Sequence, residues 1–300
     1  MGDPPWLSTP ALLITAGVFG TMLGSFFNVC IARVPRGESV VRPASHCFSC
    51  GRTVLPWDNI PILSYLWLRG RCRFCGVRFS PRYLLVEALT GVLAALVCWK
   101  FVVADPELAP GVRAARFALY FAFTGVLVVL SFIDLDTKRL PDAITLPSIP
   151  IFFLAAFAAQ DVPWLPRLIG LAVGYLLVRV IADGYYYLTG REGLGLGDGK
   201  LLAVVGAVLG WRAIPFTIFL ASFLGIAVSV PVLLAQRRRA PAPEPALEPR
   251  APEGDPPPEI LPPVRRTEVP FGPFLSLSAI IYLMVGDSLW NWLVTELSGG

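Results

Sequence analysis

Residues 117–142 read FALYFAFTGVLVVLSFIDLDTKRLPD, an apolar run that ends in a cluster of charged residues. About 20 consecutive apolar residues in a helix cross the hydrocarbon core of a bilayer. We therefore predict a membrane-spanning helix over 114–133. The first carboxylate after this span, Asp134, is then expected where the helix leaves the apolar part of the membrane.

The rest of the chain has the same apolar character. Of its 300 residues, 55% are hydrophobic and only 15% are charged, with a mean hydropathy of +0.65. Soluble domains carry about 25% charged residues. This composition excludes a disordered protein, a fibrous protein and an ordinary soluble enzyme, and it predicts an all-α protein that crosses a membrane many times. The single histidine, His46, argues against two-histidine metal sites and against a Ser-His-Asp triad.

About eight transmembrane helices are predicted from the apolar stretches. They cover 10–32, 83–104, 114–133, 143–160, 166–188, 199–210, 213–235 and 271–294. The sixth is short for a crossing unless it continues through Trp211 and Arg212 or begins in a re-entrant dip, so seven spans are the alternative. We expect the first span to stay as an anchor, because it lacks the basic start and the small-residue cleavage site of a signal peptide.

Arginine and lysine are concentrated in every second connection between these spans. They gather in 33–82, 138–139, 191–200 and 237–266, whereas the alternate connections carry Arg113, Arg116, Arg167 and Arg212. Connections rich in positive charge stay in the cytoplasm. The first set is thus predicted to be cytoplasmic and both termini to lie on the outer side. Within it, 237–270 is dense in proline and alanine and is predicted to be a linker.

The polar insert 34–82 contains two CxxC pairs, Cys47 with Cys50 and Cys72 with Cys75, each followed by a glycine. Four thiolates with this spacing suit a tetrahedral zinc site of the zinc-ribbon kind. A reducing cytoplasm favours metal over disulfides. We predict a structural zinc ion, and reduced thiols without metal are the alternative.

Two carboxylates at the predicted cytoplasmic face are candidates for chemistry. Asp134 follows the third span, and Asp198 closes Gly195-Leu196-Gly197-Asp198 at the start of the sixth. A pair of aspartates that share one proton can activate water and polarise a peptide carbonyl. Gly195 and Gly197 would let an extended substrate backbone come close. The helix N-terminus at Asp198 favours its ionised form.

Other interpretations of these acidic residues stay open on spacing alone. The aspartates can instead cap helices and neutralise nearby lysine and arginine. Asp136 is the rival of Asp134, because only one residue separates them. Glu87 and Asn28 lie within apolar spans, where polar groups are costly and often functional, so either can line a substrate site or bond to a neighbouring helix.

Taken together, these residues resemble the type IV prepilin peptidases, or prepilin leader peptidase/N-methyltransferases, which are membrane aspartic proteases of the GxGD type. The resemblance covers nearly the whole chain except the linker. It rests on Gly24-Ser25-Phe26-Phe27-Asn28-Val29 with Arg33 and Pro35, the two CxxC pairs, Pro56-Trp57-Asp58-Asn59-Ile60-Pro61, Tyr83 to Glu87, Asp134 to Asp142, Gly195 to Lys200, and Pro270-Phe271-Gly272-Pro273-Phe274.

The resemblance implies that Asp134 and Asp198 are the catalytic pair, which favours Asp134 over Asp136. It implies cleavage of the basic leader of prepilins or pseudopilins after a glycine, on the cytoplasmic side of a bacterial inner membrane. It further implies methylation of the new N-terminal residue with S-adenosylmethionine, with the cysteine insert as the mark of the bifunctional form; a peptidase without methylation is the alternative. No glycine-rich nucleotide loop is present, so Asn28, Arg33 and Glu87 are the only candidates for the methyl-donor site.

The predicted domain organisation follows from these assignments. It comprises a first transmembrane helix (1–33), a cytoplasmic cysteine domain associated with methyl transfer (34–82), a transmembrane peptidase core (83–235), the proline-rich linker (236–270) and a last transmembrane helix (271–300). The expected partners are prepilin substrates and the lipid bilayer, and no nucleic acid. A competing function of a different class is a non-catalytic membrane protein with a zinc-ribbon scaffold.

Overall fold

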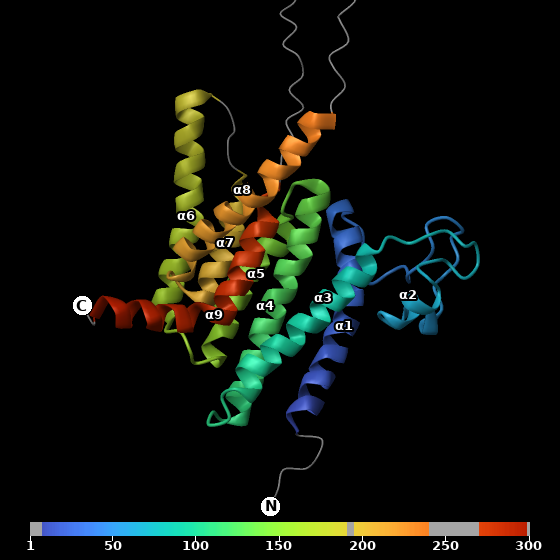
Figure 1. Cartoon of the computed structure of the whole chain (residues 1–300), viewed down its shortest axis with the longest axis horizontal. Coiled ribbons are helices and arrows are strands. Elements are labelled where there is room, and N and C mark those ends of the chain that lie inside the picture. Colours follow the sequence, from blue (N-terminus) through green and yellow to red (C-terminus); the bar gives the residue numbers. More distant parts are fainter. Residues whose placement is uncertain (1–7, 191–194, 240–269, 299–300) are drawn as a thin grey trace, which may run out of the picture.

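The computed structural model describes residues 8–190, 195–239 and 270–298 and is built from helices (Figure 1). The longer helices are α1 (Thr9–Arg33), α3 (Arg82–Cys98), α4 (Pro110–Thr137), α5 (Asp142–Ala155), α6 (Trp164–Thr189), α7 (Leu196–Leu209), α8 (Ala213–Arg239) and α9 (Gly272–Ser298). Short elements are the 3₁₀ turns Val34–Arg36, Pro56–Asn59 and Ala156–Ala158, the helix α2 (Leu63–Trp67), and one π-helical turn, Trp99–Val103. The described residues contain isolated β-bridges but no strand, as the all-α prediction requires.

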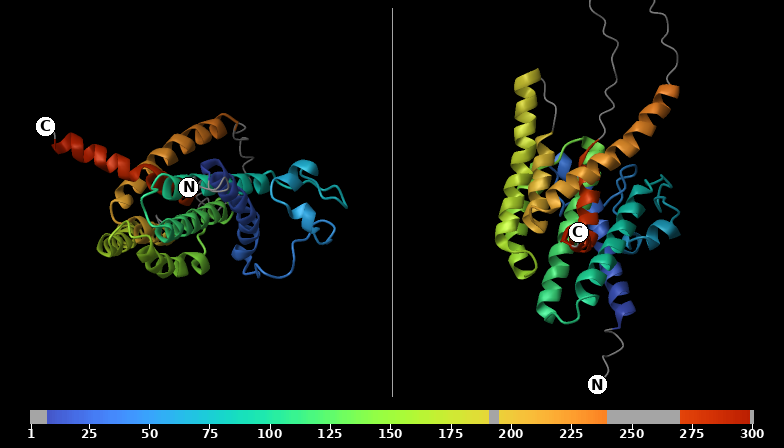
Figure 2. Two further views of the ribbon diagram at one scale, coloured as in Figure 1. Left: turned by 90° about the horizontal axis from the view of Figure 1, so that it is seen from below. Right: turned by 60° about the vertical axis from the view of Figure 1, so that its left-hand side comes forward.

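Consecutive long helices run in opposite directions. In Figure 1, α1, α4, α6 and α8 run up the picture, whereas α3, α5, α7 and α9 run down. The end of α4 and the start of α7 therefore lie at the same end of the bundle. The cysteine insert stands to one side of that end, beside α1 and α3 (Figure 2). This alternation agrees with the predicted segregation of charged connections to one face.

Among the described residues, five helical segments are long and apolar enough to cross a membrane: Thr9–Arg36, Arg82–Val103, Pro110–Thr137, Trp164–Thr189 and Ala213–Val232. Asp142–Ala158 and Gly272–Gly286 are shorter apolar helices. The count of eight crossings stays a prediction. The structure does show that α7 ends at Leu209, because Gly210 adopts φ 80° and stops it, so the sixth stretch does not continue through Trp211.

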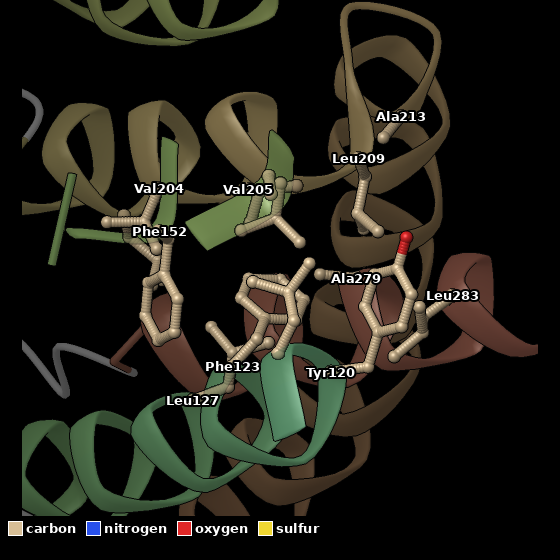
Figure 3. Close-up of a cluster of buried hydrophobic side chains, with 14 of the residues drawn as sticks. Tyr120, Phe123, Leu127, Phe152, Val204, Val205, Leu209, Ala213, Ala279 and Leu283 are labelled. Atoms are coloured by element: carbon tan, nitrogen blue, oxygen red, sulfur yellow. The ribbon is translucent and has the colours of Figure 1, made fainter. Parts of the chain in front are cut away.

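Helix α7 forms the centre of the bundle. Ten of its residues, from Gly199 to Leu209, are buried, and a helix that is apolar all round belongs in a core. Figure 3 shows Val204, Val205 and Leu209 of this helix packed against Tyr120, Phe123 and Leu127 of α4, with Phe152 of α5 and Leu283 of α9 beside them. The core thus fixes α4 and α7, the two helices that carry Asp134 and Asp198.

Glycines allow two pairs of helices to approach closely. A side chain on Gly24 of α1 would place its Cβ 2.8 Å from the Cα of Glu87 in α3. A Cβ on Gly206 of α7 would lie 2.2 Å from the carbonyl of Gly170 in α6. Small residues at such contacts are the usual means by which membrane helices pack.

The last helix bends instead of forming one straight span over 271–294. Figure 1 shows the red ribbon of α9 running down beside α4 and then turning out of the bundle. Within α9, the carbonyl oxygens of Leu283 and Met284 accept hydrogen bonds from Lys100 at 2.6 and 3.0 Å. A side chain that competes for helical carbonyls is a recognised cause of kinks.

Candidate active site

Asp134 lies in the last turn of α4, and its side chain is buried. The helix ends four residues later, where Lys138 adopts φ 54° and donates its backbone N–H to the carbonyl of Asp134. The apolar residues before Asp134, including Leu130 and Ile133, are fully buried in the core. The packing of α4 therefore turns this carboxylate toward the interior of the bundle.

Asp198 lies in the first turn of α7, immediately after the Gly195 N-cap. Its backbone N–H bonds to the carbonyl of Gly195 at 3.1 Å. Two residues later, the ammonium of Lys200 lies 2.5 Å from the carboxylate of Asp142 at the start of α5. The first turn of α7 is thus fixed both by its own turn and by an ion pair to a neighbouring helix.

The two aspartates, 64 residues apart in sequence, lie near one another in the folded chain. They are close enough for the charge of Asp134 to act on the carboxyl of Asp198. Oδ2 of Asp134 also accepts a hydrogen bond of 3.0 Å from the backbone N–H of Gly272 at the start of α9. A pair of this kind, one member of which has its own backbone donor, can hold one proton between two inequivalent carboxyl groups.

Two neighbouring carboxylates, Asp136 and Asp142, are ion-paired. Asp136 accepts two hydrogen bonds from Arg82 at 2.5 and 2.6 Å. Arg82 also donates to the carbonyl of Phe132 at 2.7 Å, so it connects the start of α3 to the end of α4. Asp142 is paired with Lys200. The alternative interpretation, in which acidic residues neutralise nearby lysine and arginine, therefore applies to Asp136 and Asp142.

The two glycines before Asp198 differ in their surroundings. Beside Gly195, the one described atom that an added Cβ would meet within 4 Å belongs to the carboxylate of Asp198, at 3.9 Å. Beside Gly197, it would lie 3.1 Å from the side chain of Leu140 in the connection between α4 and α5. Gly197 thus serves close packing as well as access.

Sequence reasoning missed Gly272 as part of the site. A Cβ at this position would lie 2.6 Å from Oδ2 of Asp134, so the close approach of α9 requires a glycine. The sequence signal was present, since Pro270-Phe271-Gly272-Pro273-Phe274 is a compact aromatic and proline motif after a long linker. Nothing in the sequence, however, paired it with a residue 138 positions earlier.

The four paired cysteines meet in one cluster in the insert. Their sulfur atoms all lie within 4.8 Å of one another, and Cys47 and Cys75 are separated by 3.7 Å. Zn–S bonds of about 2.3 Å in a tetrahedron place sulfurs about 3.8 Å apart, so the donor set fits zinc. Both knuckles turn on a glycine at positive φ, Gly51 and Gly76.

The backbone of the first knuckle stabilises a thiolate. The N–H groups of Cys50 and Ser49 point at the sulfur of Cys47 and lower the pKa of that thiol to about 6. The N–H of Val77 lowers the pKa of Cys75, but burial and the three neighbouring thiols outweigh it and raise that pKa to about 11. An N–H group that is directed at sulfur stabilises the thiolate, and the thiolate is the form that binds a metal.

Asn28, Arg33 and Glu87 lie together, but in a different place from the aspartates. All three line a cavity of about 380 Å³ between α1, the start of α3 and the insert. Asn28 donates to the carbonyl of Tyr83 at 3.1 Å, and Glu87 accepts from the backbone N–H of Ile62 at 2.7 Å. Neither Asp134 nor Asp198 is among the residues that line this cavity.

Comparison with known proteins gives two family matches along the chain. Residues 18–101 match the bacterial peptidase A24 N-terminal domain, and residues 121–230 match the type IV leader peptidase family. The prepilin leader peptidase/N-methyltransferase of Aeromonas hydrophila is 34% identical over 97% of this chain and 96% of its own length. This chain belongs to the type IV leader peptidase family.

Two further relatives match this chain. The prepilin leader peptidase/N-methyltransferase of Myxococcus xanthus (strain DK1622) is 35% identical over 96% of this chain and 95% of its own length. The protein of the same name from Klebsiella pneumoniae is 41% identical over 68% of this chain and 87% of its own length. No solved structure matches the chain. The leader peptidase match contains both Asp134 and Asp198, and the A24 N-terminal match contains the four cysteines and the cavity residues Asn28 and Glu87.

Proposed function

We propose that this member of the type IV leader peptidase family is a membrane aspartic endopeptidase that removes the basic leader of type IV prepilins or pseudopilins and methylates the new N-terminus. The observation that carries the peptidase is the buried Asp134 at one end of the bundle, close enough for its charge to act on Asp198. The name that its relatives share, prepilin leader peptidase/N-methyltransferase, supports both activities.

The pair of aspartates would cleave the peptide bond directly. One carboxylate accepts a proton from water as the water oxygen attacks the scissile carbonyl carbon, and the protonated partner donates a hydrogen bond to the carbonyl oxygen. As the C–N bond breaks, the proton passes to the departing amine. The donor from Gly272 fixes the orientation of Asp134 during these transfers. Gly195, which has no side chain, leaves room for an extended substrate beside Asp198.

The substrate and the topology fit this position. A prepilin has a charged leader followed by an apolar helix, so its cleavage site lies at a membrane surface. We place the pair at the cytoplasmic face of a bacterial inner membrane, with both termini on the periplasmic side, because the connections at this face contain most of the arginine and lysine. Residues 83–235 would form the peptidase core, and 34–82 the domain associated with methyl transfer.

The cysteine cluster would bind a structural zinc ion through Cys47, Cys50, Cys72 and Cys75. The insert contains short turns and little secondary structure, so metal binding would contribute directly to its folding. S-adenosylmethionine would supply the methyl group for the amine that cleavage releases. The competing interpretation, a peptidase without methylation, differs only in this second step.

The test of the peptidase is cleavage of a prepilin by the full chain in detergent. Asp134→Asn and Asp198→Asn should each abolish cleavage, since each removes one half of a proton-sharing pair. Asp136→Asn and Asp142→Asn are matched controls. These two carboxylates lie at the same face, but they form ion pairs with Arg82 and Lys200. Cleavage that survives either of the first two substitutions would refute the pair. Mass spectrometry of the processed pilin decides whether a methyl group was added.

A further inference from the structure

The cavity beside the insert has the size of a small-molecule site, and residues of α1, α3 and the insert line it. Its volume of about 380 Å³ falls in the range of about 300–1,000 Å³ that is usual for such sites. Asn28 and Arg33 come from α1, Glu87 comes from α3, and Tyr65 comes from the insert. Residues of the insert, which lies beside α1 and α3 in Figure 1, line one side of this cavity.

Glu87 is the most unusual residue in this wall. It is a carboxylate in an apolar helix, and only 8% of its surface is exposed. Burying a charged carboxylate costs free energy unless the charge is paired and hydrogen-bonded. Its Oε2 accepts the backbone N–H of Ile62 at 2.7 Å. Because a carboxylate has about four acceptor positions, the bonds from Ile62 and from the side chain of Ser25 leave Glu87 capacity for further interactions.

The contact between Glu87 and Ile62 also holds a strained piece of backbone. Ile62 has φ 62° and ψ −56°, a conformation that β-branched residues rarely adopt. Strain of this kind persists where surrounding contacts enforce it and is concentrated at functional sites. Glu87, which lines the cavity, holds the insert against α3 at Ile62 through this hydrogen bond.

The polar groups in the cavity match the parts of S-adenosylmethionine. This molecule combines a positive sulfonium, an amino-acid carboxylate, a ribose and an adenine ring. The cavity offers the carboxylate of Glu87, the guanidinium groups of Arg33 and Arg36, and the aromatic rings of Tyr65 and Tyr83. Guanidinium groups bind carboxylates well, and aromatic faces attract cations.

We propose that this cavity is the S-adenosylmethionine site, with Glu87 as the carboxylate that balances the positive charge of the sulfonium. The inference rests on the proposed methyl transfer and gives it a location. It assigns the two reactions to two places, since the cavity lining includes neither catalytic aspartate. The cleaved pilin must therefore present its new amine to a second site before it leaves.

The test measures the binding of two ligands that differ in charge. Full-length protein in detergent is equilibrated with radiolabelled S-adenosylmethionine or with S-adenosylhomocysteine, which lacks the positive sulfonium. Glu87→Gln keeps the size of the side chain and an acceptor for the N–H of Ile62. It should weaken binding of S-adenosylmethionine about tenfold, because a charged interaction is lost, and leave S-adenosylhomocysteine nearly unchanged.

A second variant tests the cavity without changing its charge. Ala32 lines the cavity, so Ala32→Phe should fill it and remove the binding of both ligands. Glu107→Gln is the matched control for Glu87→Gln, because Glu107 is exposed in the connection after α3 and does not line the cavity. The Glu107→Gln protein should bind both ligands and cleave prepilin like the wild type, and a melting curve of each variant shows whether the bundle is folded.

The outcomes separate this inference from the proposed function. If Glu87→Gln affects both ligands equally or neither, Glu87 does not balance the sulfonium. Unchanged binding by Ala32→Phe places the methyl donor elsewhere, while methylation of the pilin would still stand. If the wild-type protein binds neither ligand and its processed pilin never gains a methylene mass, the methyl transfer itself is wrong.

Discussion

Replacing Gly272 by alanine tests how closely the catalytic pair depends on the last helix. An alanine Cβ would lie 2.6 Å from Oδ2 and 3.2 Å from Cγ of Asp134, whereas ordinary contact begins at 3.4 Å. The carboxylate must therefore move by about 0.8 Å. The backbone N–H of residue 272 is retained in the variant, so the change is steric.

Such a displacement should affect catalysis more than stability. A misplacement of about 1 Å in a reacting group can cost about a hundredfold in rate, so we expect kcat for prepilin cleavage to fall by about ten- to a hundredfold. Crowding in a packed site costs about 1–3 kcal/mol of stability, which should lower Tm by several degrees without unfolding the protein. KM should change less than kcat, because the substitution displaces a reacting carboxylate.

The measurement is steady-state cleavage of a prepilin by the purified variant well below its Tm. Gly184→Ala is the control, because Gly184 is a helical glycine with no heavy atom within 4 Å of the added Cβ. It should keep the wild-type kcat and gain slightly in stability. A Gly272→Ala protein with the wild-type kcat would show that Asp134 is not held in a unique position by α9.

Three further predictions concern the parts around the pair. Arg82→Met, which removes the bonds to Asp136 and the α4 backbone, should slow cleavage several-fold in a prepilin assay; an unchanged rate means that the connection from α3 is not needed. Hydrogen bonds from Arg73 lower the pKa of Asp58, so their contribution to the insert is present above the unfolded pKa of about 3.9 and is lost as the pH falls through the lower folded value. Melting curves of wild type and Asp58→Asn should therefore converge at low pH, and parallel curves would contradict this. Removal of metal by a chelator should release about one zinc ion per chain and lower Tm, whereas replacing the four cysteines by serine should abolish both effects; protein purified without zinc argues against the site.

The cysteine site and the helical character were predictable because their signals are local. Apolar runs of the right length form helices in lipid, where each backbone group must find its partner within the segment. The spacing of the CxxC pairs and the glycines after them already encodes the two knuckles, and both glycines have the expected positive φ. Residue types and short distances along the chain were sufficient in both cases.

The choice between neighbouring aspartates needed the packed structure. Asp134 and Asp136 are two residues apart on a helix, so their side chains differ in direction by about 200°. The sequence alone does not state which face of α4 meets α7, and the resemblance was what favoured Asp134. Packing turns Asp134 inward and leaves Asp136 to Arg82. The expectation that Asp198 is the more readily ionised partner stays a prediction, since Asp134 has a backbone donor of its own.

By itself, the sequence determined a helical membrane protein with a cysteine knuckle pair and carboxylates at one face, because hydropathy and short motifs act over a few residues. Tertiary structure decided the rest: the glycine of α9 that bonds to Asp134, the early end of α7, and the grouping of Asn28, Arg33 and Glu87 around a cavity. These features join residues that are far apart in the chain. They depend on which helix faces come together, and that is settled by the packing of the whole bundle.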